Sequence, residues 1–304
     1  MGESFGFRRT RQDDQIVSMF RTSTRSSYGL VTSAGRLVLA HVVELPKVSA
    51  DGPLSVTGGV KAEELLGMTE NTDPIRGERV IAAIDMPSTD DGGQLVPLAL
   101  GTRNGVVKRW NRESPTTMDS WSVIDLKDDD EVLAAAEARD EDRLVFVSTD
   151  SSLLTFEAKN VRPQGRTAGG MAGIRLAEGC SVAAFAVVPD GKVTWNYEEG
   201  ENGLFSASGA VVLTVAGDSE ALPGTENGAA KVTPLEMYPT KGRGTGGVRS
   251  QRFLKGQDTL ILAFVGAYPL HASTQSGAPV ELPKPDMRRD GSGTDLSAPI
   301  AVVG

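Results

Sequence analysis

The sequence has little of what most catalytic and metal-binding sites are built from. Its 304 residues include one cysteine and two histidines, and neither His41 nor His271 has a cysteine or carboxylate at ligand spacing. We therefore expect no metal site, no acid–base histidine and no cofactor. The single Cys180 excludes a disulfide framework and is typical of a reducing compartment, which predicts a cytoplasmic protein in which this residue packs in the core.

Long apolar runs and aromatic residues are also scarce. No run approaches the ~18 apolar residues that a membrane helix needs, and no secretory signal peptide opens the chain. Aromatic residues make up 5% of the sequence, and the three tryptophans are too scattered for a base-stacking platform. No nucleophile–base pair stands out either, so we expect a fragment that is not an enzyme by itself. Met1-Gly2 is interpreted as a start placed before an excised domain.

Turn-forming residues are abundant instead. The chain has 35 glycines and 16 prolines, and short apolar stretches alternate with turn signals such as Thr32–Gly35 and Thr102–Gly105. This pattern predicts an all-β, repeat-built propeller with five blades in one domain over residues 1–304, because radial repetition removes free sheet edges. Two β-sandwich domains are the alternative. The expected blades cover approximately residues 11–86, 95–138, 143–189, 209–265 and 268–304, with Gly35, Gly105, Ser152 and Gly277 at equivalent turns.

One glycine-rich basic segment occurs twice. Residues 165–176 and 242–253 match at an offset of 77, which also relates Gly179 to Gly256, and an apolar stretch follows each copy. A phosphate-binding P-loop would need Lys-Ser or Lys-Thr after the glycines and a helix after the loop, and both are missing. The repeat therefore indicates binding loops on a repeat architecture rather than a nucleotide site.

Charge is strongly segregated along the chain. The formal net charge of −9 and the pI near 4.9 argue, taken alone, against a nucleic-acid-binding protein. However, residues 102–112, 159–176 and 239–255 together hold thirteen lysines and arginines and no acid, whereas residues 125–142 hold nine acids. We interpret Asp128–Glu131 as a polar turn rather than a metal site. We expect the negative charge of this turn to limit how far a DNA duplex extends along the protein.

Several motifs resemble the C-terminal repeat of bacterial type IIA topoisomerase A subunits. They are Thr-x-x-Gly-Val-Val-Lys-Arg from Thr102 to Arg109, Ile-Asp-Leu-x-x-x-Asp-Glu-Val from Ile124 to Val132, and the Gly-Arg-x-x-Gly-Gly-x-x-x-x-Arg loops starting at Gly165 and Gly242. The resemblance implies a β-pinwheel, in which neighbouring blades exchange strands, and a DNA-binding and DNA-bending role. It also implies a separate catalytic core that carries the nucleophilic tyrosine, so none of the four tyrosines here takes that role.

The family divides into two types. Gyrase carries a Gln-Arg-Arg-Gly-Gly-Lys-Gly box before its first blade, whereas this sequence has only Gly6-Phe7-Arg8-Arg9-Thr10-Arg11 in that neighbourhood. Five units and the acidic net charge also make the chain look like the A-type polypeptide of topoisomerase IV. The resemblance then implies that the whole protein is part of an ATP-dependent enzyme of the bacterial nucleoid. The implied partners of this domain are double-stranded DNA, the rest of the A subunit and an ATPase B subunit. A gyrase-type DNA-wrapping domain and a protein-interaction propeller are the alternatives.

Basic loop residues are the candidate DNA contacts. Arginine forks fit phosphate oxygens, and cations spaced along an edge bind DNA without reading its sequence; a merely solubilising charged face is the alternative interpretation. Because the glycine-rich loops lie within the expected blades three and four, we expect those blades to contribute more than blades two and five. The candidates are Arg21, Arg25, Arg36, Lys108, Arg109, Arg112, Arg162, Arg166, Arg175, Lys241, Arg243, Arg249 and Arg252.

Overall fold

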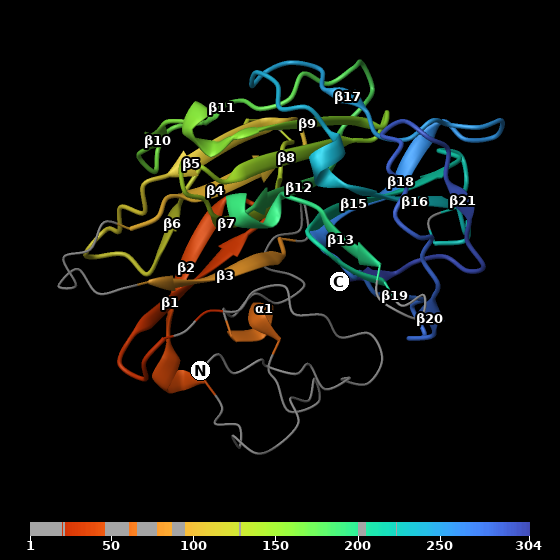
Figure 1. The fold of residues 1–304 in the computed structure, drawn as a ribbon. Helices are drawn as coiled ribbons and strands as arrows, with labels where there is room; N and C mark the ends of the chain where they lie inside the picture. Colours follow the sequence, from red (N-terminus) through yellow and green to blue (C-terminus); the bar gives the residue numbers. More distant parts are fainter. Residues whose placement is uncertain are drawn as a thin grey trace.

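The computed structural model describes residues 20, 22–45, 61–65, 78–86, 95–127, 129–199, 205–222 and 224–304. Within these ranges the chain consists of β-strands, single 3-10 turns and one short α-helix, α1 (Ala62–Leu65). The strands form five small sheets and one separate hairpin, which follow one another along the chain (Figure 1). The predicted all-β, five-bladed pinwheel is thereby confirmed.

The sheets are built as follows. The first has the order β3-β1-β2-β6, from β1 (Ser27–Thr32), β2 (Arg36–His41), β3 (Val80–Met86) and β6 (Ser120–Ser122). The second joins β4 (Leu98–Thr102), β5 (Val106–Trp110), β7 (Val132–Glu137), β10 (Pro163–Gln164) and β11 (Met171–Ala172). The third has the order β12-β8-β9-β17, from β8 (Arg143–Ser148), β9 (Ser152–Glu157), β12 (Val182–Val188) and β17 (Val248–Arg249). The fourth has the order β18-β15-β16-β21, from β15 (Ala210–Gly217), β16 (Ala229–Pro234), β18 (Thr259–Ala267) and β21 (Thr294–Asp295). The fifth has the order β20-β19-β22, from β19 (Ala272–Ser273), β20 (Pro279–Val280) and β22 (Val302–Val303).

Strand exchange joins each of the first four sheets to the chain that follows it. β6 comes after β5 in sequence but pairs with β2, and β10 and β11 come after β9 but pair with β5. In the same way β17 pairs with β9 of the third sheet, and β21 pairs with β16 of the fourth. The exchanged strands cover outer sheet edges that would otherwise offer unpaired backbone groups. In Figure 1 they follow the outer border of the molecule, from β6 through β10, β11 and β17 to β21.

The alternation of side chains along each central strand builds the core between successive sheets. In β4, Leu98 and Leu100 pack toward the first sheet, and Ala99 between them packs toward the third. In β8, Phe146 packs with the second sheet and Val147 with the fourth. Strands buried on both faces are therefore almost wholly apolar, as the sequence shows.

A residue with positive φ closes the central turn of each of the first four sheets, and its carbonyl accepts a hydrogen bond from the exchanged segment. The predicted markers Gly35 (φ 72°) and Gly105 (φ 83°) hold this position. In the third sheet the marker is Ser151 (φ 67°) rather than Ser152, and Gly228 (φ 72°) is a fourth that the sequence pattern did not reveal. The hydrogen bonds are Val123 N to Gly35 O (2.9 Å), Gly173 N to Gly105 O (2.8 Å), Ser250 N to Ser151 O (2.7 Å) and Leu296 N to Gly228 O (3.0 Å).

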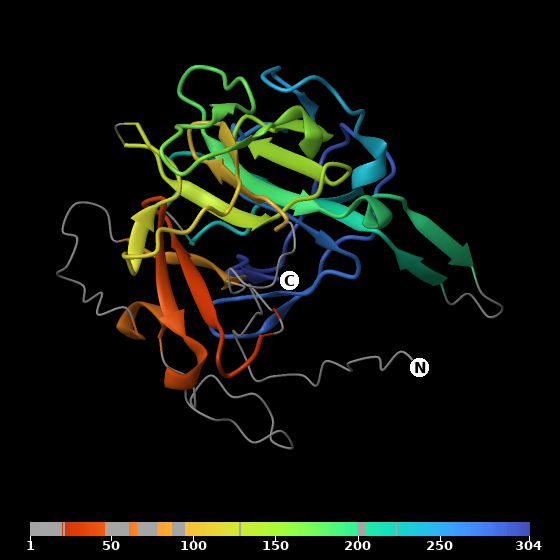
Figure 2. The ribbon, with the colours of Figure 1, turned by 90° about the vertical axis from the view of Figure 1, so that its left-hand side faces the viewer.

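A hairpin interrupts the repeat between the third and fourth sheets. It is an antiparallel pair, β13 (Asn196–Glu199) with β14 (Phe205–Ser208). Figure 2 shows this pair projecting from the body of the molecule on the right. Trp195 at its base packs edge-on against Tyr268, with ring centroids 5.3 Å apart.

Candidate nucleic-acid interface

Strand exchange places the two glycine-rich loops on the outer edge. The first loop runs from β10 to β11 and so lies on the second sheet, and the second loop leads into β17 on the third sheet. Each loop therefore sits one sheet earlier than the blades to which the sequence assigned it. Gly170 (φ 85°) and Gly247 (φ 73°) precede the exchanged strands, and a Cβ there would meet the carbonyl oxygen of Val107 or Leu153.

Lys108 holds the backbone of the first loop from the interior of the protein. The residue is fully buried on β5, and its Nζ donates hydrogen bonds to the carbonyl oxygens of Arg166 (3.0 Å) and Ala168 (2.6 Å). Burial lowers the pKa of Lys108 to about 8, although the charges of Asp125 and Glu113 raise it. Lys108 is thus a structural support for the loop, and its assignment as a DNA contact is corrected.

Arg109 and Arg112 are also interior residues. Arg109 donates to the carbonyl oxygens of Ala158, Val161 and Ala138 at 3.0–3.2 Å and forms an ion pair with Asp140 at 2.7 Å. The side chain of Arg112 is 2% exposed and reaches Glu137 and the carbonyl oxygen of Asp85. Because both arginines are buried, neither is available for contact with a duplex, and their assignment as DNA contacts is corrected. The sequence could not separate them from the loop cations, since cations on a β-strand can point either way.

The cations of the exchanged segments behave differently. Seven of the candidates on these segments have no carboxylate partner among the described residues. Arg166 and Arg243 are half-buried, and the exposed ones are Arg162, Arg175, Lys241, Arg249 and Arg252. They lie before, within and after the glycine-rich loops, and hence along the outer border. This is the arrangement that a line of phosphates requires.

Arg243 is held more firmly than the other loop arginines. Its Nη1 donates to the carbonyl oxygen of Ala172 (2.6 Å) and its Nε to that of Asn160 (3.2 Å), so the second loop is tied to the segment that carries the first. A guanidinium has five N–H donors, and the remaining ones stay available. Arg175 lies beside this loop, because its backbone N–H donates to the carbonyl oxygen of Thr245 (3.0 Å). Arg175 and Arg243 thus belong to two consecutive exchanged segments that contact each other through this backbone hydrogen bond, and we treat them as one cationic pair.

The candidates of the first sheet are less well placed. Arg21 lies outside the described residues, and Arg25 is exposed before β1. Arg36 makes a bidentate contact with Glu78, with its Nε 2.9 Å and its Nη2 2.6 Å from the two carboxylate oxygens. A phosphate that reached Arg36 would have to compete with this carboxylate.

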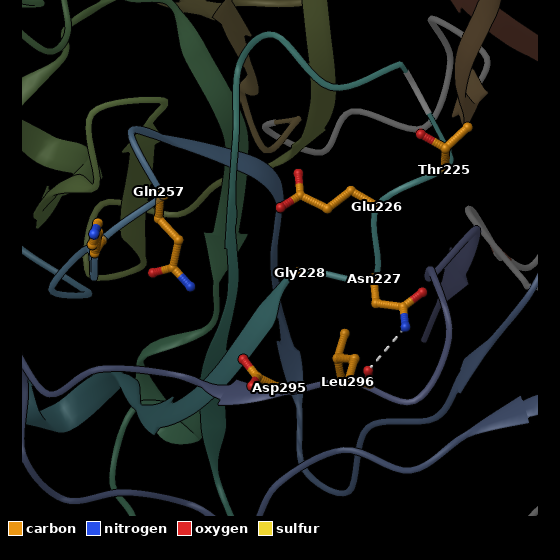
Figure 3. A pocket seen from close by; sticks show the side chains of 9 residues that line it. Thr225, Glu226, Asn227, Gly228, Gln257, Asp295 and Leu296 are labelled. Carbon is orange, nitrogen blue, oxygen red and sulfur yellow. Dashed lines mark hydrogen bonds between the residues drawn. The ribbon is translucent and has the colours of Figure 1, made fainter.

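Two shallow grooves lie at the outer edge. One of about 760 Å³ is lined by Arg36, Trp121, Asp125 and Arg166 where the first loop meets the first sheet. The other, of about 520 Å³, lies at the turn before Gly228, where Asn227 Nδ2 donates to the carbonyl oxygen of Leu296 at 3.2 Å (Figure 3).

Among the described residues there is no group of three potential metal ligands and no helix long and apolar enough to cross a membrane.

The sequence interpretation overlooked a second buried lysine. Lys231 on β16 is 2% exposed, and its Nζ donates to the carbonyl oxygens of Ser250 (3.2 Å) and Arg289 (3.0 Å). Desolvation lowers the pKa of Lys231 to about 8, whereas Asp286 and Asp290 raise it. A sequence signal exists, because Gly228-Ala-Ala-Lys231 repeats the spacing of Gly105-Val-Val-Lys108.

Comparison with known proteins shows that the chain is similar to DNA gyrase A proteins. The model of the DNA gyrase C-terminal domain, a β-propeller, matches residues 142–189 and 224–266. The chain is 26% identical over 290 residues to the DNA gyrase A protein of Mycolicibacterium smegmatis, covering 93% of this chain and 30% of the relative. It is also 26% identical over 289 residues to the corresponding gyrase A protein of Staphylococcus epidermidis, covering 93% and 28%. The chain thus spans less than a third of the length of these relatives.

Solved structures show the same fold. The C-terminal domain of DNA topoisomerase IV matches with a TM-score of 0.65 at 19% identity, covering 92% of this chain and 79% of that one. The DNA gyrase A C-terminal domain matches with a TM-score of 0.57 at 17% identity, covering 98% and 92%.

Proposed function

We propose that the chain is a C-terminal domain of the kind found in type IIA topoisomerase A subunits, and that it binds double-stranded DNA along its outer border; its similarity to DNA gyrase A proteins supports this. The observation that carries this proposal is the line of exposed cations without carboxylate partners on the exchanged segments, represented by Arg162, Arg175 and Arg252. Each phosphate that they neutralise releases counterions, which favours binding without sequence preference. The formal charge of −9 does not oppose this, because residues 159–176 and 239–255, which hold the two glycine-rich loops, contain no acid.

The salt dependence of binding tests the proposal. We expect the affinity for a short duplex to fall steeply with salt, and the double variant Arg175→Ala, Arg243→Ala to lower the slope of log K against log salt by about 2. Lys192→Ala is the matched control, because this exposed lysine lies in a 3-10 turn outside the loops. A salt-independent affinity, or equal slopes for the double variant and the control, would contradict the proposal.

We propose further that the domain is used in the manner of topoisomerase IV. It would hold one DNA segment for the breakage–reunion core of the A-type polypeptide, which works with an ATPase B subunit in an ATP-dependent enzyme of the nucleoid. The acidic net charge and the presence of five sheets support this. Gyrase-type wrapping is the second candidate, because the sequence relatives are gyrase A proteins.

A topology assay separates these two uses. A nicked circle is ligated in the presence of the domain and then analysed by gel. Chiral wrapping leaves a net linking difference, whereas holding a segment leaves none. A protein-interaction propeller, the remaining alternative, would bind an acidic protein partner that duplex DNA does not displace.

A further inference from the structure

A third exchanged loop precedes β21, although the sequence repeat does not reveal it. Thr294 and Asp295 of β21 pair with Ala230 and Ala229 of β16, in the same way that Met171 and Ala172 pair with Val107 and Val106 of β5. The distances from the turn glycines agree, since Gly105 lies one residue before Val106 and Gly228 one residue before Ala229. This register makes Arg289 the counterpart of Arg166.

The contacts between neighbouring loops repeat as well. Arg175 N donates to the carbonyl oxygen of Thr245 in the second loop (3.0 Å), and Arg252 N donates to that of Gly291 in the third (3.0 Å). Thr245 lies two residues after Arg243, and Gly291 lies two residues after Arg289. The second and third loops therefore each contact the backbone of an arginine that follows the preceding exchanged strand.

A buried lysine supports the third loop just as one supports the first. Lys231 Nζ reaches the carbonyl oxygen of Arg289 at 3.0 Å, and Lys108 Nζ reaches that of Arg166 at the same distance. Gly293 stands directly before β21, where a Cβ would lie 2.6 Å from the carbonyl oxygen of Ala229, just as Gly170 stands before β11. The buried lysine and the arginine thus keep one spatial relation in both loops, and each loop ends in a glycine, although only Gly170 has a positive φ.

We propose that residues 285–293 form a third DNA-contact loop centred on Arg289, and that Arg252 and Arg289 together form a second phosphate-binding pair equivalent to Arg175 and Arg243. This inference rests on the proposed DNA binding and extends it to the fourth sheet, on which β21 lies. Arg289 is half-buried, as Arg166 and Arg243 are, and Arg252 is exposed, as Arg175 is. No ion pair of Arg289 or Arg252 occurs among the described residues.

Local acids conceal this loop in the sequence. Asp286 and Asp290 break the carboxylate-free pattern, and one glycine stands where the other loops have two. Asp286, however, is occupied by Arg288, whose Nε and Nη2 lie 3.1 Å from its two carboxylate oxygens. The paired Arg288 is therefore a matched control for Arg289, one residue away on the same loop.

The experiment measures duplex affinity against salt for the whole chain and its variants. We expect Arg289→Ala to weaken binding about tenfold at moderate salt and to lower the salt slope by about 0.9. Arg288→Ala should change the slope much less, because Asp286 already neutralises that charge. Arg289→Lys should keep the slope, because the charge remains. Thermal unfolding of each variant shows whether the fold is kept.

The outcomes distinguish this inference from the proposed function. If the Arg175→Ala, Arg243→Ala variant loses slope but Arg289→Ala matches Arg288→Ala, the third loop is overturned while DNA binding stands. If the duplex affinity of the unsubstituted chain does not depend on salt, the proposed DNA binding itself is contradicted. If Arg289→Ala unfolds and Arg289→Lys, although folded, loses the slope, the role of Arg289 is structural and the inference is again overturned.

Discussion

The cations of strand β5 and those of the exchanged loops have similar sequence surroundings but opposite roles. Lys108 and Arg109 lie in a carboxylate-free stretch, as Arg175 and Arg243 do. The strand cations are buried and donate to carbonyl oxygens of loops and turns, whereas Arg175 is exposed at the border. The interior cations hold the backbone that presents the exterior ones. A basic segment therefore identifies the loop system as a whole but not which of its residues meet a ligand.

Arg109 gives the largest expected effect. Arg109→Met would leave the carbonyl oxygens of Ala138, Ala158 and Val161 without this donor. Leaving a buried acceptor unsatisfied costs about 1–3 kcal/mol of the free energy of unfolding for each group. Urea unfolding measures this loss, while the folded fraction should bind DNA with an unchanged salt slope. Arg175→Ala is the opposite case, with stability within about 0.5 kcal/mol and a reduced slope. A stable Arg109→Met variant that lost DNA affinity would reverse the comparison.

The two buried lysines make stability depend on pH. Their folded-state pKa of about 8 lies below the unfolded value of 10.5, so the unfolded chain binds more protons between these values. The cost of burying the charges is therefore fully present below about pH 8 and is relieved as the pH rises toward 10.5. Relative to the double variant Lys108→Met, Lys231→Met, the unsubstituted chain should gain about 2 kcal/mol per lysine from about pH 7 to about pH 9.5. Parallel curves of unfolding free energy against pH would show that the lysines titrate normally.

Features that depend on residues close together in the sequence could be predicted, and features that depend on distant residues could not. The turns at Gly35 and Gly105 and the alternating strands are local, and the sequence predicted them correctly. The placement of the first glycine-rich loop on the second sheet depends on pairing between β11 and β5, about sixty residues apart, which neither spacing nor composition encodes. For the same reason the burial of Arg109 could not be predicted from the sequence. Its hydrogen-bond acceptors, the carbonyl oxygens of Ala138 and Ala158, come close to it only after the sheets have packed.

The contact between Asp125 and the first loop provides the test with the smallest expected effect and the greatest selectivity. Asp125 N donates to the carbonyl oxygen of Ala168 at 3.2 Å, the position that Arg175 and Arg252 hold at the next two loops. The first loop thus rests on an exposed carboxylate where the others rest on an arginine, and Asp125 and Arg166 line the same groove.

Asp125→Arg should extend the cationic line by one pair. The backbone hydrogen bond stays, because only the side chain changes, and the new charge faces solvent. We expect the salt slope to steepen by about 1 and the duplex affinity to rise by about 0.5–1 kcal/mol. Asp125→Asn is the matched control, since it removes the repulsion without adding a cation and should raise the affinity with little change in slope. Equal slopes for both variants would mean that a duplex does not reach the first junction, and that the DNA path begins with Arg175 and Arg243.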